Sequence, residues 1–210
     1  PSGVHALRRW LLEGQRPAVN LLIIVASVHA ALEAPAFSHR MLPRARDLNR
    51  CFRPPFEDEQ GRLAEEILEV LRLHRPEAVV DMHNTSGSGP SFGVCTRLDR
   101  QHDALVSLFT RRLIVSRLDL GALMETSDER CPTVTIEVGG RLDDEAHALA
   151  WEGLQRYATA ERVLAGDDET DWGLEILCDP IRLELREGVT LAYGEAPRAG
   201  HHITLCADIE

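Results

Sequence analysis

The sequence predicts an α/β protein with a mostly parallel or mixed sheet flanked by helices, followed by a small β-rich C-terminal region. Predicted helices and predicted strands alternate along the chain. The strands are continuous apolar runs, which are typical of strands buried on both faces. After the acidic stretch 166–171, short alternating segments typical of half-exposed strands replace them. We therefore expect an α/β domain over residues 1–165 and a β-rich region over 166–210.

Each element follows from its own local pattern. Apolar residues at helical spacing predict helices over residues 2–13, 57–74, 102–116 and 144–164. Continuous apolar runs predict buried strands over residues 19–25, 78–83 and 133–138. A loop rich in glycine and serine follows the second of these strands, and two glycines end the third. In the C-terminal region, alternation predicts strands over residues 174–177, 181–185, 189–193 and 203–205.

Charge and cysteine content narrow the class of protein. With 23 basic and 34 acidic residues, the net charge is −11, which disfavours nucleic acid and anionic membrane surfaces as partners. The longest apolar run, Leu21 to Ala26, is too short to span a bilayer. The five cysteines are scattered without a C-x-x-C pair, which favours reduced thiols and a cytoplasmic location. The oligomeric state stays open, a homo-oligomer included.

Asp81 and His83 end the predicted strand 78–83, just before the glycine-rich loop. Ligands of open α/β sheets bind outside the carboxyl ends of strands, and residues two apart in a strand face the same way. A neutral imidazole at this position is a candidate metal ligand, with Asp81 orienting a neighbouring group. The alternative is a histidine that makes local hydrogen bonds and helps to form the turn, because one histidine is weak support for a metal site.

Glu137 interrupts the apolar strand 133–138. Burying a carboxylate is costly unless it is paired or used in chemistry, so Glu137 is a candidate general base. A structural ion pair with an arginine explains its presence equally well.

The stretch 34–55 gathers positive charge in an otherwise acidic chain, with arginines at positions 40, 44, 46, 50 and 53. Within it, Asn49 and Arg50 combine a directional amide with a planar guanidinium, a pairing that suits a bound carboxylate. The alternative is a solvated loop whose arginines pair with acidic neighbours, which fits Arg40 and Arg53 better than Arg50.

Three segments together resemble the succinylglutamate desuccinylase/aspartoacylase family of zinc amidohydrolases, which has a zinc carboxypeptidase-like fold. They are Asp47-Leu48-Asn49-Arg50, Asp81-Met82-His83-Asn84-Thr85 and Ile136-Glu137-Val138-Gly139, in the family's order. The likeness covers residues 1 to about 165. It implies zinc as cofactor and hydrolysis of the amide bond of an N-acyl amino acid or a similar small carboxylate-bearing amide.

The resemblance also implies roles for individual residues. His83 corresponds to the third zinc ligand, and Glu137 to the general base that deprotonates the attacking water. Asn49 and Arg50 correspond to groups that hold a substrate carboxylate, and Arg130 is a further candidate for that role. The family's carbonyl-polarising arginine does not align cleanly here, so Arg44 is the first candidate and Arg46 the second.

One part of the family pattern is missing from the sequence. The first two zinc ligands of the family belong to an H-G-N-E motif, and Pro1-Ser2-Gly3 resembles the turn that follows it. We therefore expect an N-terminal strand and this motif to precede Pro1 in the parent protein, and truncation at the C-terminal end as well. Two alternatives follow: a carboxylate-binding module without catalysis, and a zinc carboxypeptidase that acts on peptide ends.

Overall fold

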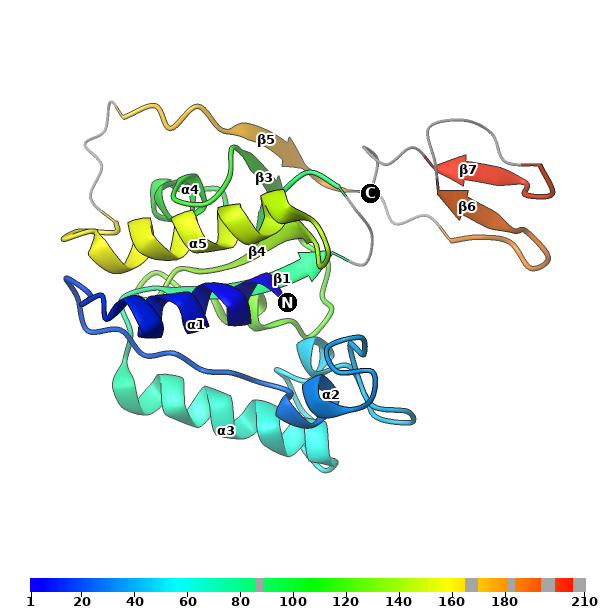
Figure 1. Ribbon diagram of the computed structural model, residues 1–210, viewed down its shortest axis with the longest axis horizontal. Coiled ribbons are helices and arrows are strands. Elements are labelled where there is room, and N and C mark those ends of the chain that lie inside the picture. Colours follow the sequence, from blue (N-terminus) through cyan, green and yellow to red (C-terminus); the bar gives the residue numbers. More distant parts are fainter. Residues whose placement is uncertain (86–88, 165–169, 181–183, 194–198, 206–210) are drawn as a thin grey trace.

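A mixed five-stranded sheet forms the centre of the molecule (Figure 1). The computed structural model describes residues 1–85, 89–164, 170–180, 184–193 and 199–205. The strands run in the order β1-β4-β2-β3-β5, and only the β4–β2 pair is antiparallel. Their bounds are β1 Val79–Thr85, β2 Phe92–Cys95, β3 Arg112–Val115, β4 Thr133–Gly140 and β5 Glu175–Cys178. This architecture confirms the predicted fold class.

Strand β4, which lies between β1 and β2, is buried along its length except at Glu137, which is partly exposed. Its apolar side chains form the main core with residues of α1 (Ser2–Glu13), α4 (Arg100–Ser107) and α5 (Asp144–Thr159). A largely apolar interior strand between covered faces removes a large nonpolar area from water. The single carboxylate in it is therefore the exception that positions a site.

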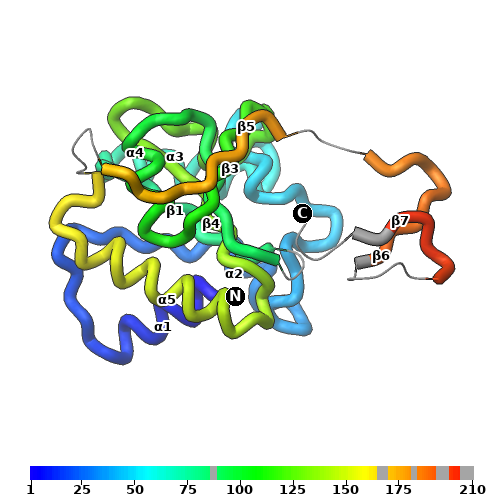
Figure 2. The backbone as a smooth tube through the Cα atoms, turned by 90° about the horizontal axis from the view of Figure 1, so that it is seen from above, coloured from blue at the N-terminus to red at the C-terminus, as the bar shows by residue number. Residues whose placement is uncertain are grey.

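Helices α1 and α5 pack side by side on one face of the sheet (Figures 1 and 2). Trp10 and Trp151 meet edge to face with ring centroids 6.3 Å apart, and the Arg9 guanidinium lies 4.2 Å from the Trp151 ring centroid. Aromatic pairs favour such edge contacts, and the cation adds attraction to the ring face. Helix α1 ends at Gly14, whose φ of 63° lies in the left-handed region.

Helix α3 (Glu59–His74) covers the other face (Figure 2). Asp58 begins it by accepting a hydrogen bond from the Gly61 backbone N–H. A second core beneath α3 includes Leu48 of the 3-10 helix η1 (Leu48–Arg50) and Leu123 of η2 (Leu123–Thr126). The short helix α2 (Val28–Leu32) lies between α1 and η1 in the sequence. The second core thus fixes the arginine-rich stretch against the sheet.

The strand predicted over residues 19–25 is wrong. No described strand pairs with this segment, and Leu22, Ile23, Ile24 and Val25 are each 42–49% exposed. An apolar run gives a tendency to extend, but a strand forms only where a neighbouring edge accepts its backbone hydrogen bonds. In the described chain, β1 pairs on one side with β4 and its other side has no strand neighbour.

The helix predicted over residues 102–116 is correct only in its first half. Helix α4 ends at Ser107, and β3 follows at Arg112. Leu113, Ile114 and Val115 continue the helical spacing of apolar residues, but they also suit a strand between two others. These residues form a strand because β3 pairs with β2 on one side and with β5 on the other. Strand β2 was not predicted.

The C-terminal region contributes to the main sheet. Strand β5, beyond residue 165, pairs with β3 in parallel. Strands β6 (Leu191–Tyr193) and β7 (Ile203–Leu205) form a separate parallel pair, drawn apart from the main body in Figure 1. The first three residues of the predicted strand 181–185 lie outside the described residues. None of the described helices is long and apolar enough to cross a bilayer.

Candidate active site

His83 on β1 lies directly across the sheet from Glu137 on β4. The two strands are parallel neighbours, and their register pairs these two residues. His83 Nδ1 is 3.5 Å from Glu137 Oε1, and His83 Nε2 is 3.0 Å from Asp81 Oδ2. The tertiary structure thus brings together two of the predicted site residues, and Asp81, which the sequence analysis proposed to orient a neighbouring group, lies on the opposite side of the ring.

Charge dominates the properties of this histidine. Burial lowers the pKa of His83, but the neighbouring Asp81 carboxylate, followed by Glu137, outweighs burial and raises the pKa to about 10. Without a bound cation the ring is therefore an imidazolium at neutral pH, held between two carboxylates. A metal ion at this ring would have to displace that proton and would take over its role as counter-charge.

Glu137 carries an unused acceptor. Its Oε2 atom is buried and has no hydrogen-bond partner among the described residues, while Oε1 faces His83. A buried, unpaired carboxylate oxygen is costly in a folded protein unless a water molecule, an ion or a substrate occupies the neighbouring position. The side chain remains about a fifth exposed, so a small molecule can reach it.

The arginine-rich stretch separates into paired and unpaired side chains. Arg46 makes a two-point contact with Asp58, at 2.5 and 2.9 Å, and also donates to the Pro55 carbonyl. The Arg40 and Arg53 guanidinium groups are bound by Asp47 and Asp119, respectively.

By contrast, Arg44 is exposed, and no described carboxylate pairs with it. The Arg50 guanidinium donates 2.6 Å to the Asn49 carbonyl and likewise meets no described carboxylate. Arg44 and Arg50 are therefore the arginines of this stretch with charge available for an anionic ligand, whereas Arg46 is committed to Asp58.

Asn49 has a structural partner of its own. Its Oδ1 accepts a hydrogen bond of 2.9 Å from the Leu123 backbone N–H, which joins η1 to η2. Arg130 is exposed, and its backbone N–H donates 2.8 Å to Asp128 Oδ1. Among the described residues, no hydrogen bond or ion pair joins Arg44, Arg50 or Arg130 to the His83–Glu137 pair. Their predicted roles remain predictions.

A zinc site needs more donors than the described residues supply. Within the described ranges, no group of three or more His, Cys, Asp or Glu side chains is arranged to hold a metal ion. Catalytic zinc sites generally have three protein ligands and one open position. His83 and the unpartnered Glu137 oxygen fit one ligand and one neighbouring base, and the remaining ligands are not among these residues.

Two polar networks were missed by the sequence analysis. One joins Ser2, Asn84, His147 and Gly139, and the other joins Asp99, His102 and Ser127. The only sequence signal was polar residues next to strand and helix ends. In most of these hydrogen-bonded pairs the two residues are 25 to 145 positions apart in the sequence. Local sequence patterns therefore do not reveal the networks.

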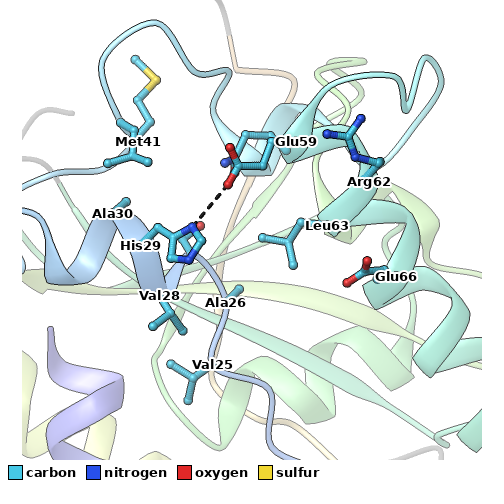
Figure 3. A pocket seen from close by; sticks show the side chains of 13 residues that line it. Val25, Ala26, Val28, His29, Ala30, Met41, Glu59, Arg62, Leu63 and Glu66 are labelled. Carbon is cyan, nitrogen blue, oxygen red and sulfur yellow. Dashed lines mark hydrogen bonds and ion pairs between the residues drawn. The ribbon is translucent and has the colours of Figure 1, made fainter.

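A separate cavity of about 310 Å³ lies between the exposed end of the 19–25 run and α3 (Figure 3). His29 and Glu59 face each other across it, with 3.3 Å between Nδ1 and Oε1. Val25, Met41 and Leu63 supply apolar lining. The cavity does not include the His83–Glu137 pair.

Comparison with known proteins gives a consistent family. The sequence model described as the succinylglutamate desuccinylase/aspartoacylase catalytic domain matches residues 2–158. No curated protein sequence matches the chain.

Several solved structures share the fold. A succinylglutamate desuccinylase from Vibrio parahaemolyticus is 18% identical with a TM-score of 0.56, over 75% of this chain and 52% of that chain. A succinylglutamate desuccinylase/aspartoacylase from Rhodobacter sphaeroides is 18% identical with a TM-score of 0.52, over 72% and 50%. A mutant of murine aminoacylase 3 is 19% identical with a TM-score of 0.51, over 73% and 58%. The chain thus spans about half the length of these proteins.

Proposed function

Because the chain belongs to the succinylglutamate desuccinylase/aspartoacylase family, we propose that it is part of a zinc-dependent deacylase that hydrolyses the amide bond of an N-acyl amino acid or similar small amide. The observation that carries this proposal is the Glu137 side chain beside His83, with a buried Oε2 that has no hydrogen-bond partner in the described part of the chain. That position suits a carboxylate that accepts a proton from an attacking water.

We assign the following catalytic and substrate-binding roles to residues of this chain. Glu137 takes a proton from water as the water oxygen attacks the acyl carbon, and delivers it to the nitrogen of the leaving amine as the C–N bond breaks. Arg44 stabilises the negative charge that develops on the acyl oxygen. Asn49 and Arg50, with Arg130, hold the free carboxylate of the substrate. The products are a carboxylic acid and an amino acid.

His83 would hold the zinc ion as one of its ligands. When bound, zinc would supply Lewis acidity to the acyl oxygen and to the attacking water. The complementary donors have to come from outside the described residues, and we propose an H-x-x-E motif before Pro1 as their source. The open side of β1 is compatible with an additional strand there, because β1 has no other strand neighbour than β4 in the described chain.

A second function is favoured by the single histidine ligand among the described residues. A non-catalytic member of the family would keep Arg50 and Asn49 as a carboxylate-binding pocket and would need no metal. It predicts that an N-acyl amino acid binds the metal-free protein, and that Arg50→Ala abolishes this binding.

Elemental analysis of protein expressed from its complete reading frame separates the two functions. About one zinc per chain, together with hydrolysis of members of an N-acyl amino acid panel, supports the deacylase. Absence of zinc after reconstitution, with retained ligand binding, supports the binding module. Glu137→Gln should lose turnover, by roughly 100-fold or more, without loss of fold. The matched control is Glu77→Gln, an exposed carboxylate just before β1.

A further inference from the structure

The ladder between the two site strands is broken one residue after the site. His83 pairs with Glu137, but Thr85 pairs with Gly140, so Asn84 on β1 faces both Val138 and Gly139 on β4. Such an irregularity leaves backbone groups without their regular partners and allows the two strand ends to shift relative to each other. Whatever bridges this break sets the alignment of His83 with Glu137.

The Asn84 side chain bridges the break. Its Nδ2 donates 2.9 Å to the Gly139 carbonyl, which supplies the missing link between β1 and β4. The same nitrogen donates 2.8 Å to Ser2 Oγ, and Asn84 Oδ1 accepts 2.8 Å from the Ser2 backbone N–H. Both donor hydrogens and the acceptor oxygen of this one amide are therefore engaged.

Ser2 extends the connection to two helices. It begins α1, is fully buried, and its Oγ lies 2.8 Å from His147 Nδ1 on α5. Because Ser2 Oγ accepts from Asn84, its own proton is available for donation to His147. The side chains of Asn84 and Ser2, one half-buried and one buried, thus join four elements: the first turn of α1, the ends of β1 and β4, and α5.

Gly139 has little freedom to adjust on its own. Its φ is +110°, and a Cβ at this position would lie 3.2 Å from the Gly89 carbonyl oxygen and 3.3 Å from the Ala146 Cβ. Its carbonyl direction is therefore defined by an unusual backbone conformation and by close neighbours, and Asn84 matches that direction. Glutamine or serine at position 84 would be too long or too short to reach Gly139 and Ser2 together.

We propose that Asn84, together with Ser2, is a positioning residue of the active site: it holds the His83 and Glu137 strand ends in register and anchors the start of α1 to them. The inference rests on the proposed zinc-dependent function for its catalytic consequence, but its geometric part stands on the contacts above. Outer-shell residues that orient ligands typically change metal affinity or activity by about 10- to 100-fold when they are replaced.

The test compares Asn84→Ala and Ser2→Ala with Asn20→Ala in the full-length, zinc-loaded protein. Asn20 is exposed and has no described side-chain partner, so it controls for loss of an asparagine. Asn84→Ala should weaken zinc in a chelator competition and lower kcat, each by about 10-fold or more, with KM changed by less than about twofold. Ser2→Ala should act in the same direction with a smaller effect, because the bond to Gly139 remains.

Zinc affinity and kcat of Asn84→Ala within about twofold of the wild type would overturn the proposal. If Asn84→Ala does not fold, Ser2→Ala decides in the same way. If the wild type itself binds no zinc, the proposed function fails, and amide hydrogen exchange of the metal-free protein tests the positioning alone. Faster exchange at Gly139 and Gly140 in Asn84→Ala than in Asn20→Ala supports it, and equal exchange overturns it.

Discussion

His83 Nδ1 lies 3.5 Å from Glu137 Oε1, and the opposite ring nitrogen lies 3.0 Å from Asp81 Oδ2, so one imidazole separates two carboxylates. This geometry explains why the pKa of His83 is raised to about 10 although burial alone would lower it. In the absence of metal, His83 therefore keeps its proton between these two carboxylates. The protonation of His83 can be measured before any substrate is known.

The first prediction concerns the two carboxylates separately. In the metal-free protein, Asp81→Asn should lower the pKa of His83 more than Glu137→Gln does, because Asp81 is the larger of the two raising influences. NMR titration of the His83 ring protons measures both changes, with Glu77→Gln as the control. A His83 titration that is unchanged in Asp81→Asn would contradict the geometry of this pair.

The second prediction follows by linkage. The pKa of His83 is raised in the folded chain from an ordinary value of 6.5, so the imidazolium stabilises the folded state. This contribution is fully present below about pH 6.5 and is lost as the pH rises toward about 10. Urea unfolding of the metal-free protein between pH 6.5 and 9 should therefore show falling stability, with a flatter profile in Asp81→Asn. Parallel profiles for the two proteins would count against it.

The third prediction separates two neighbouring arginines. Arg44→Ala should lower kcat by about 100-fold, as expected for loss of an oxyanion donor, with little change in thermal stability. Arg46→Ala should instead lower stability, because Arg46 binds Asp58 at the start of α3 and the Pro55 carbonyl. Arg53→Ala, which breaks an exposed ion pair, is the control and should leave activity close to the wild type.

If Arg46→Ala rather than Arg44→Ala loses turnover at unchanged stability, the assignment of the polarising arginine has to be exchanged. Steady-state kinetics and a melting curve on each variant are sufficient for this decision.

The fourth prediction concerns His102, which is 1% exposed. Its Nδ1 lies 2.8 Å from Asp99 Oδ1, and its Nε2 lies 2.8 Å from Ser127 Oγ, so it joins the start of α4 to the segment before β4. His102→Ala leaves a cavity and removes one hydrogen bond each from Asp99 and Ser127, which keep their bonds to backbone N–H groups. It should destabilise the fold by about 2–4 kcal/mol. Urea denaturation measures the loss, and His74→Ala, at an exposed helix end, should cost far less. A loss equal to that control would show that this network is not stabilising.

Local patterns were sufficient for the elements that carry strong periodicity. Helices α1, α3 and α5 and strands β1 and β4 all form within a few residues of their predicted positions. The reason is that an amphipathic stripe buries its apolar side in one helical orientation, and an apolar run forms a buried strand where a neighbouring strand edge is available. The two strands that carry His83 and Glu137 were among them, so the strand ends that hold these two candidate residues could be predicted.

The remainder depended on partners distant in the sequence. The 19–25 run has strand-forming residues but no neighbouring strand to pair with in the described chain. Leu113 to Val115, by contrast, pair with β2 and β5 and form part of β3. Arg44 and Arg46 are alike in sequence, and only the position of Asp58 commits one of them. Asn84 resembles any loop residue until Ser2 and Gly139 are placed around it.

The sequence by itself determined helices α1, α3 and α5, strands β1 and β4, and which residue types stand at the ends of these two strands. The tertiary structure alone decided strand pairing, the direction of each guanidinium and the contacts of the Asn84 amide. Periodicity is a property of neighbouring residues, whereas a hydrogen bond between positions 82 apart exists only once the chain has folded.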